Sequence, residues 1–520
     1  MQSLPTPPGQ WLVLLPVLIP LAGAALLLLL RQMKLLQLPL AVLIAAVTAL
    51  CDFVLVMRVA ESGPQAMTMG NWLPPFGIAF TVDALGAGFA FAAALVVTIV
   101  LLPLGADAPD RARRDGLYPQ VLLLLAGVSG AFVTGDLFNL YVWFEVMLIA
   151  SFGLLALGRQ PMQLDGTVKY GFPNFMATSI FLLALGLLYG LMGTLNMADL
   201  IGASARADKA ALAAIAALLL VGFGMKAAGF PLNTWLAASY HTPPPAIAAL
   251  LAALLTKVGA YALIRSLAMV LPDARVMLEP ALAVVAVATL TLGPLAAIAE
   301  TGLRRLIGFL LIGGIGAMLA GLALGTEQGL AGAASYGIHA MLALGALYVI
   351  AGLVEKLTGA GDTRAMGGLL AMSPLIAMVF GLALFAVAGV PPLSGFWPKF
   401  LLVTAGIDRW LATGDMTALT LWLAVLLNAL LSLIAVARLF AHVAWRAAPL
   451  PGFAPQGPRQ VMLTSREERM VLWPAALLVM GLVGLGLWPE PIMGFGMATA
   501  KALLDPAAYI AATQLAGGSP

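Results

Sequence analysis

Long apolar stretches recur along the whole chain, from Trp11 to Leu487, and they constrain the fold more than any other feature. Only 9% of the 520 residues are charged, against about 25% in soluble domains, which excludes an ordinary water-soluble enzyme. The stretches lack the two-residue alternation of a transmembrane β-barrel. Because lipid offers no hydrogen bonds, a helical bundle is the remaining way to pair every backbone group. The sequence therefore predicts an all-α polytopic membrane protein.

At ~20 residues for each span plus a short loop, the chain has room for about 14 transmembrane helices. The expected spans are 11–30, 36–57, 82–104, 117–134, 136–157, 171–194, 210–239, 243–267, 276–298, 303–325, 330–354, 371–406, 417–445 and 470–488. Two of them, 210–239 and 371–406, are too long for one helix and contain proline, so each is expected to be broken. A final segment, 491–513, is short and of mixed polarity, and is expected at a membrane surface.

Loop charges predict the orientation. With the N-terminus outside, the inside loops hold 16 Lys and Arg residues, Arg459 among them, and the outside loops hold seven, including Arg265. This excess of inside cations follows the positive-inside rule and supports an even number of spans, with both termini outside. The first apolar stretch has no basic leader, so no cleaved signal peptide is expected.

An internal repeat is visible in two segments, Lys226-Ala-Ala-Gly-Phe-Pro-Leu and Val387-Ala-Gly-Val-Pro-Pro-Leu. Proline removes a backbone donor and clashes with the preceding turn, so helix breaks are expected near 226–231 and 389–394. Matched breaks favour an ion pathway in a repeat-built transporter, although single proline kinks are common in membrane helices. Since the copies lie five helices apart, an odd number, they should have opposite orientations.

This repeat divides the chain into four expected parts. They are an N-terminal three-helix segment (1–110), a first antiporter-like repeat (111–268), a second, inverted repeat (269–447), and a C-terminal part with a loop, the last helix and an interfacial segment (448–520).

Five ionisable residues fall inside the expected spans: Glu145, Lys226, Lys257, His339 and Lys399. A charge at the bilayer centre costs about 2.5–3.5 kcal/mol or more, so each needs a partner or water. We expect the glutamate to pair with the first lysine, and the second lysine and the histidine to relay protons to the last lysine through bridging waters. The alternatives are a static salt bridge, a core histidine, and a lysine that snorkels towards the membrane surface.

Four further polar residues are more ambiguous. Asp136 precedes a helix and is either its N-cap or a residue of the path. Asp52 and Asp83 lie near span ends and are expected to face headgroups or to cap helices. His241 lies in a loop, where solvation is favoured over a role in proton entry.

Several chemistries are not expected. The single Cys51 excludes an iron–sulfur cluster or a disulfide framework within this chain, and three histidines without metal-binding spacing argue against structural zinc. Because neither a Walker lysine motif nor a GxGxxG after a strand is present, no cofactor is expected. The net charge of +3 requires no nucleic-acid partner.

Four motifs resemble a known family. They are Thr134-Gly-Asp-Leu-Phe-Asn-Leu-Tyr-Val-Trp-Phe-Glu, Gly193-Thr-Leu-Asn-Met-Ala-Asp-Leu, Leu255-Thr-Lys-Val-Gly-Ala-Tyr-Ala-Leu-Ile-Arg and Pro391-Pro-Leu-Ser-Gly-Phe-Trp-Pro-Lys-Phe. Together they resemble the D subunit of Mrp-type monovalent cation/proton antiporters, which is homologous to the antiporter-like proton-pumping subunits of respiratory complex I (NADH-quinone oxidoreductase).

The resemblance implies fourteen helices, inverted five-helix repeats and a polar axis across the membrane plane. By motif match, Glu145 is the fifth-helix glutamate, and Lys226, Lys257 and Lys399 are the lysines of helices seven, eight and twelve; His339 is the eleventh-helix histidine. Two positions depart from the family pattern: Leu344 replaces a lysine, and the tenth helix reads Gly308-Phe-Leu-Leu-Ile-Gly-Gly-Ile-Gly instead of a polar stretch. Both departures leave the relay between the last two lysines to water.

The leading hypothesis is therefore an ion-translocating subunit, not itself an enzyme, that works with other subunits in a bacterial plasma membrane and couples protons to Na⁺ or K⁺. Two alternatives remain: a proton-pumping subunit of a complex I-like NADH-quinone oxidoreductase or membrane hydrogenase, and a divergent, non-conducting structural subunit.

Overall fold

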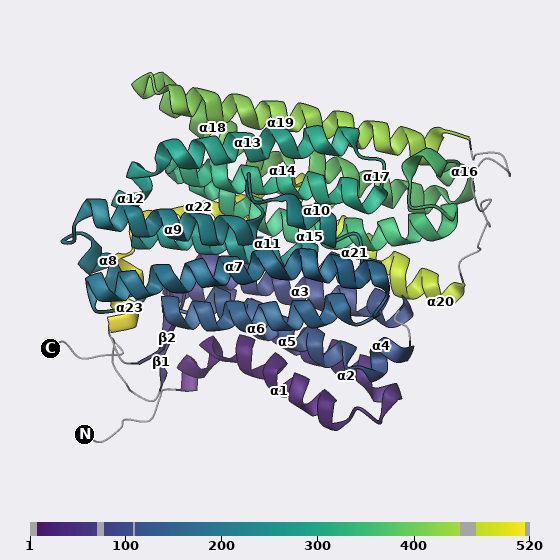
Figure 1. Ribbon diagram of the computed structural model, residues 1–520, viewed down its shortest axis with the longest axis horizontal. Helices are drawn as coiled ribbons and strands as arrows, with labels where there is room; N and C mark the ends of the chain where they lie inside the picture. Colours follow the sequence, from purple (N-terminus) through teal and green to yellow (C-terminus); the bar gives the residue numbers. More distant parts are fainter. Residues whose placement is uncertain (1–7, 70–76, 108–109, 448–463, 515–520) are drawn as a thin grey trace.

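The computed structural model describes residues 8–69, 77–107, 110–447 and 464–514, and it shows long helices lying side by side in one bundle (Figure 1). Arg459 and most of the expected C-terminal loop lie outside these residues. The prediction of an all-helical membrane protein is confirmed, with one two-stranded hairpin as an addition within the described chain.

The N-terminal part contains three long helices and the hairpin. Its elements are η1 (Pro8–Val13), α1 (Leu15–Leu29), α2 (Lys34–Ser62), β1 (Gln65–Thr68), β2 (Ala79–Val82), α3 (Ala84–Asp107) and α4 (Asp110–Arg114). The two strands are antiparallel, with Gln65 opposite Val82.

The next part corresponds to the first expected repeat. Its elements are α5 (Leu117–Val133), α6 (Leu137–Ala156), α7 (Pro161–Met192), α8 (Met197–Ser204), α9 (Lys209–Ala227), α10 (Thr234–Ser239), α11 (Pro245–Ile264) and the π-helical turn η3 (Arg265–Val270).

The second expected repeat follows. Its elements are α12 (Pro272–Met277), α13 (Glu279–Ala299), α14 (Leu303–Leu324), α15 (Glu327–Thr358), η4 (Thr363–Ala365), α16 (Leu369–Met372), α17 (Pro374–Ala388), α18 (Phe396–Thr413), α19 (Met416–Phe440) and η5 (Ala441–Trp445). The chain closes with α20 (Ser465–Glu467), η6 (Glu468–Leu472), α21 (Trp473–Leu487), α22 (Glu490–Leu504) and α23 (Ala507–Gln514).

Each expected span coincides with a helix or, at 210–239 and 371–406, with a pair of helices. Within the described chain, 11 helices are long and apolar enough to cross a membrane, and α1, α5 and α17 are shorter apolar helices. The number that crosses stays a prediction. The helix α7 begins ten residues before its expected start, because Gln160 and Gln163 form a capping box around Pro161 and an exposed Asp165–Lys169 pair continues the helix beyond its apolar part.

The two helix breaks are confirmed. One lies between α9 and α10 and the other between α17 and α18, and each contains a cis peptide bond before proline, at Pro231 and Pro392. Both half-helices end in a left-handed residue, Ala228 (φ 60°) and Gly389 (φ 84°). In the structure Ala228 thus corresponds to Gly389, and Pro231 to Pro392. The sequence motif Ala-Gly-apolar-Pro instead matches Ala228 with Ala388, which is one residue earlier in the second copy.

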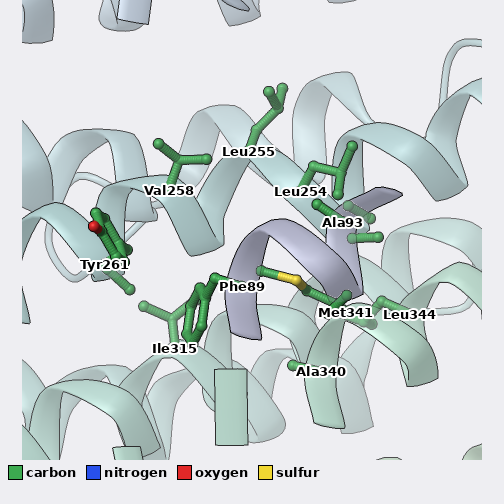
Figure 2. Close-up of a cluster of buried hydrophobic side chains, with 14 of the residues drawn as sticks. Phe89, Ala93, Leu254, Leu255, Val258, Tyr261, Ile315, Ala340, Met341 and Leu344 are labelled. Carbon is green, nitrogen blue, oxygen red and sulfur yellow. The ribbon is translucent and has the colours of Figure 1, made fainter. Parts of the chain in front are cut away.

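The core lies where α3 of the N-terminal part meets α11, α14 and α15 (Figure 2). Phe89, Tyr261 and Ile315 pack at one level, and Ala93, Met341 and Leu344 pack further along the helices. The helix α11 is buried along its whole length, as expected for a helix at the centre of a bundle. Lys257 of α11 and His339 of α15 are both buried there, so they are removed from both lipid and water.

The hairpin marks one end of the bundle. Both η1 and α23 contact β1, whereas α4, α16 and α20 lie at the opposite end (Figure 1). The described elements nearest the two termini therefore share one side, as the even number of spans predicts. The final segment, expected at a membrane surface, forms α22 and α23, and α22 packs against α15 and α3.

Candidate functional site

A small cavity at the centre of the bundle joins two of the five ionisable residues. Lys257 of α11 and His339 of α15 both line it, together with Tyr336. Its volume is about 10 Å³, which is the room that about one water molecule needs. The Lys257 ammonium is fully buried and its Nζ donates to the Ala252 carbonyl at 2.7 Å. A single water could thus connect the lysine to the histidine.

The wall of this cavity is otherwise apolar. Leu344 lines it, as do residues of the tenth expected span, Leu310, Leu311, Gly314 and Ile315. The two departures from the family pattern therefore line the same cavity as Lys257 and His339. Their side chains offer no hydrogen-bonding group, so the histidine, the lysine and Tyr336 are the polar side chains of this wall.

The second helix break approaches His339 directly. The histidine Nδ1 lies 2.9 Å from the Ser394 hydroxyl, at the start of α18. The neighbouring Gly395 leaves no space for a side chain, because a Cβ there would overlap the Ala386 carbonyl oxygen and would lie 2.9 Å from the histidine Nε2. The break is held in place by α21, since Ser394 N donates to the Leu482 carbonyl at 3.2 Å.

Lys399 occupies the other side of the same break. It is buried, and its Nζ donates to the Ala388 carbonyl, the last of α17, at 2.8 Å. The carbonyls at a helix C-terminus lack partners within the helix and carry partial negative charge, so an ammonium is favoured there. Lys257, His339 and Lys399 are thus brought together around one cavity and one break.

Glu145 and Lys226 do not form the expected ion pair within 4 Å in the structure. The Lys226 Nζ is buried without a hydrogen-bond acceptor among the described residues, and it lies 5.1 Å from the centre of the Phe144 ring. Glu145 directly follows Phe144 in α6, so its carboxylate is near the Lys226 ammonium but does not contact it. The direct pairing is therefore wrong, for a physical reason: α6 directs Phe144 towards α9 and turns Glu145 outwards.

Glu145 instead lines a groove between α6 and α7 on the outside of the bundle. The groove has a volume of about 600 Å³, and the hydroxyl residues Tyr141, Thr178 and Ser179 share its wall. Gly186 also lines it, and Gly190 lies one turn further along the same exposed face; a Cβ at either glycine would have no neighbour within 4 Å. A carboxylate on this face has lipid or another protein as its environment, not the interior of this chain.

Asp136 is the N-cap of α6. Its Oδ1 accepts from the backbone N–H of Phe138 at 2.8 Å and of Asn139 at 2.9 Å, as the capping alternative predicts. Burial raises the pKa of this carboxyl to about 6, against the opposing effect of the two backbone bonds. Burial likewise lowers the pKa of His241, which is half-buried rather than fully solvated and has its Nδ1 3.0 Å from the Ala237 carbonyl.

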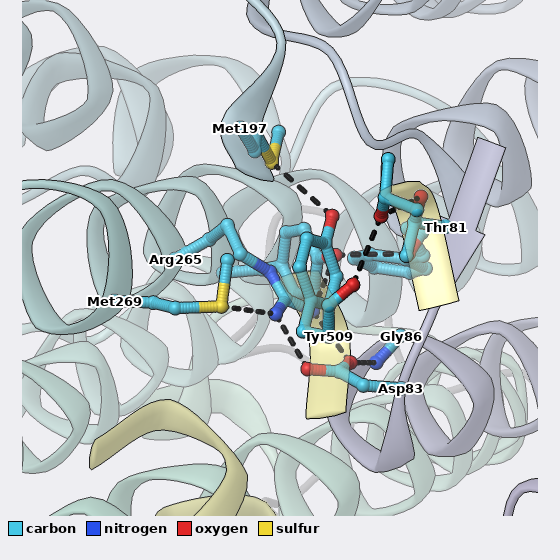
Figure 3. Close-up of polar contacts among 10 residues, drawn as sticks. Thr81, Asp83, Gly86, Met197, Arg265, Met269 and Tyr509 are labelled. Carbon is cyan, nitrogen blue, oxygen red and sulfur yellow. Dashed lines mark hydrogen bonds and ion pairs between the residues drawn. The ribbon is translucent and has the colours of Figure 1, made fainter. Parts of the chain in front are cut away.

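A buried ion pair between Asp83 and Arg265 was missed from the sequence (Figure 3). Both side chains are 1% exposed, and the two guanidinium contacts measure 2.5 and 2.6 Å. Asp83 also caps α3 by accepting from Gly86 N, so the capping alternative is right for it and the headgroup alternative is wrong. Counting Arg265 as an outside-loop cation was wrong, because the chain continues helically through η3 and turns this side chain into the bundle.

Asp52 was also placed wrongly. It was expected to face headgroups or to cap a helix, but it lies within α2 and is fully buried, and neither carboxyl oxygen has a hydrogen-bond partner in the described chain. The helix α2 extends to Ser62, ten residues further, which moves Asp52 away from the span end.

Two residues around His339 were likewise missed, and the sequence held a signal for each. Tyr336 precedes the histidine by three residues, which places both on one helix face. Ser394 directly follows the Pro391-Pro392-Leu393 break, where the chain has free backbone groups and a polar side chain can reach across.

Comparison with known proteins bears on this site. Residues 134–431 match the model of the NADH:quinone oxidoreductase/Mrp antiporter transmembrane family. The D subunit of the Na⁺/H⁺ antiporter of Bacillus subtilis is 35% identical over 501 residues, covering 96% of this chain and 98% of that protein. The chain belongs to the family of Mrp antiporter D subunits. The matched region contains all five ionisable residues, and the sequence-based resemblance is confirmed.

Other relatives of this family agree. The D subunit of the Na⁺/H⁺ antiporter of Alkalihalophilus pseudofirmus is 34% identical over 96% of this chain and 98% of its own length. A chain of the Mrp complex from Dietzia sp. superposes with a TM-score of 0.86 at 27% identity, covering 97% of this chain and 99% of that one. A chain of respiratory complex I from Thermus thermophilus shares the fold, with a TM-score of 0.79 at 24% identity over 95% and 99% of the two chains.

Proposed function

We propose that this chain is the ion-translocating subunit of a multisubunit Na⁺ or K⁺/H⁺ antiporter in a bacterial plasma membrane, and that protons move along its buried Lys and His residues. The observation that carries the proposal is the grouping of Lys257, His339 and Lys399 around one cavity and one helix break. The relatives that are named as Na⁺/H⁺ antiporter proteins support the cation and its coupling to protons.

The proposed proton steps follow from the contacts. A protonated Lys257 gives a proton through one bridging water to neutral His339, whose ring can accept at one nitrogen while it donates at the other. The Ser394 hydroxyl both accepts and donates, so it can carry the exchange from the ring into the break. Lys399 receives the proton there, and the Ala388 carbonyl stabilises its charged form.

Leu344 favours a second candidate, a non-conducting subunit, because it places an apolar wall beside the proposed path. The likeness to complex I is one of fold, so it favours no oxidoreductase function for this chain.

One substitution separates the two candidates. We expect Lys399→Met, in the complete complex in vesicles, to reduce cation-driven proton exchange at least tenfold, because the break then lacks its proton acceptor. Lys169→Met is the matched control, since Lys169 is half exposed and pairs with Asp165, four residues earlier on α7. Exchange that persists in Lys399→Met, with both variants present at equal amounts, would favour the non-conducting candidate.

The partner subunits implied by this function need a docking surface, and we infer that the groove between α6 and α7 is one. An uncompensated carboxylate facing hydrocarbon costs about 2.5–3.5 kcal/mol, so Glu145 favours a polar or cationic side chain opposite it. The exposed Gly186 and Gly190 form a small-xxx-small face of the kind that lets two membrane helices approach closely. The occupant we propose is a transmembrane helix of a partner subunit.

Filling the groove tests this interface. Gly186→Leu should abolish co-purification of the partner subunits and leave the chain itself folded, because the position is on the outside of α7 and a Cβ there meets nothing within 4 Å. Gly481→Leu on α21 is the control, since that glycine is equally open. Retention of all partners by Gly186→Leu would show that another surface mediates assembly.

A further inference from the structure

Asp52 is a buried carboxyl that the proposed path does not use. It belongs to α2 of the N-terminal part, outside both repeats, and its side chain is 0% exposed. Both oxygens lack a hydrogen-bond partner among the described residues, whereas the equally buried Asp83 has Arg265 and Gly86 N. The Asp83 carboxylate is thus paired with a cation and a backbone donor, whereas the Asp52 carboxyl has neither among the described residues.

The neighbouring elements offer Asp52 no cation. The helix α2 packs on α1, α3, α5 and η1. Neither α1, η1 nor the described part of α3 up to residue 106 contains an ionisable residue, and the only one in α5 is Tyr118, at the end remote from the hairpin. On α2 itself the nearest titratable group is the thiol of Cys51, and the two cations of this helix, Lys34 and Arg58, make no hydrogen bond to either Asp52 oxygen.

Among the helices that pack against α2, the polar side chain at nearly the same depth as Asp52 is Ser129 of α5. Both α2 and α5 run towards the hairpin, because Ser62 leads into β1 and Thr134 pairs with Phe80 of β2. Ile44 and Leu122 both approach Gly23 of α1, which sets a common level for the two helices. Asp52 lies eight residues beyond Ile44, and Ser129 lies seven residues beyond Leu122. At 1.5 Å per residue, the two side chains are therefore about 12 and 10.5 Å from that common level along their helix axes, so they lie at nearly the same depth.

Ser129, like Asp52, is a buried polar residue whose side chain lacks a hydrogen-bond partner among the described residues. A serine can donate to a carboxyl oxygen or accept from a carboxylic O–H, whichever protonation state is present. One hydroxyl does not, however, balance a full negative charge in hydrocarbon, where an isolated ionised carboxylate is strongly disfavoured.

We propose that Asp52 is a proton-binding site that lies outside the Lys and His path and holds a proton at neutral pH. A proton fits better than a metal cation, since hard cations require several oxygen ligands and the described chain has no cluster of three or more His, Cys, Asp or Glu residues that could hold one. This inference does not depend on the proposed transport function, because it concerns the charge state of one carboxyl.

Infrared spectroscopy of the complete complex in lipid vesicles tests the proposal. At about pH 7 an ordinary aspartate is ionised, because its pKa is about 3.9. The difference spectrum between the wild type and Asp52→Asn should show the loss of one C=O stretch of a neutral carboxylic acid. The control Asp165→Asn, at an exposed position, should instead show the loss of ionised carboxylate bands.

The two possible results separate clearly. Asparagine has nearly the shape of a neutral aspartic acid, so Asp52→Asn is expected to fold and assemble as the wild type does. A spectrum in which Asp52→Asn loses carboxylate bands, as the control does, would overturn the proposal. The result is independent of transport, so a failure of the antiporter proposal would leave it unchanged.

Discussion

Asp83→Asn should lower the free energy of unfolding by about 3–5 kcal/mol, the typical cost of removing one partner of a buried ion pair. The remaining Arg265 charge would be held at 1% exposure, with the Tyr261 hydroxyl at 3.1 Å and the Met269 sulfur at 3.3 Å as polar contacts and the Tyr261 and Tyr509 rings 5.3 and 5.5 Å from its guanidinium carbon. None of these groups carries a negative charge. Denaturant titration of the chain in mixed micelles measures the difference.

The matched control is Asp165→Asn, which removes an ion pair of similar length at the surface. Its Asp165–Lys169 pair spans 2.5 Å, but the two side chains are 57% and 50% exposed, so the expected loss is at most about 1 kcal/mol. Equal losses for the two variants would contradict the account of the buried pair. The double substitution Asp83→Leu with Arg265→Met should recover most of the stability, because no buried charge remains.

Gly395→Ala should reduce cation/proton exchange at least tenfold while the chain still folds. The added methyl group would overlap the Ala386 carbonyl oxygen and would meet the His339 Nε2 at 2.9 Å, so the break must move away from the histidine. A shift of about 1 Å disrupts the 2.9 Å contact between His339 and Ser394 on which the proposed proton exchange depends.

Gly481→Ala is the control for this substitution. That glycine lies within α21, and a Cβ there meets nothing within 4 Å, so alanine should preserve exchange and add up to about 1 kcal/mol of helix stability. The measurement is the rate of cation-driven proton uptake by vesicles that contain the complete complex. Wild-type rates in Gly395→Ala would show that the break can shift without consequence.

The sequence alone predicted the elements of the fold well, for a local reason. An apolar stretch of about 20 residues must form a helix in lipid whatever surrounds it. The breaks near 226–231 and 389–394 were predictable in the same way, since a proline acts on its own turn. The sequence also identified the buried positions of Lys257, His339 and Lys399, because a charge inside an apolar stretch is conspicuous.

The partners of those charges were decided by tertiary structure. Arg265 pairs with Asp83, 182 positions away, while Glu145 turns away from Lys226 and Asp52 has no described partner. Nothing local sets these outcomes, because they depend on the rotation and depth of each helix against neighbours that are distant in the chain. Leu344 illustrates the same point: the sequence shows an apolar residue, and only the packing of α11, α14 and α15 places it in the wall between a lysine and a histidine.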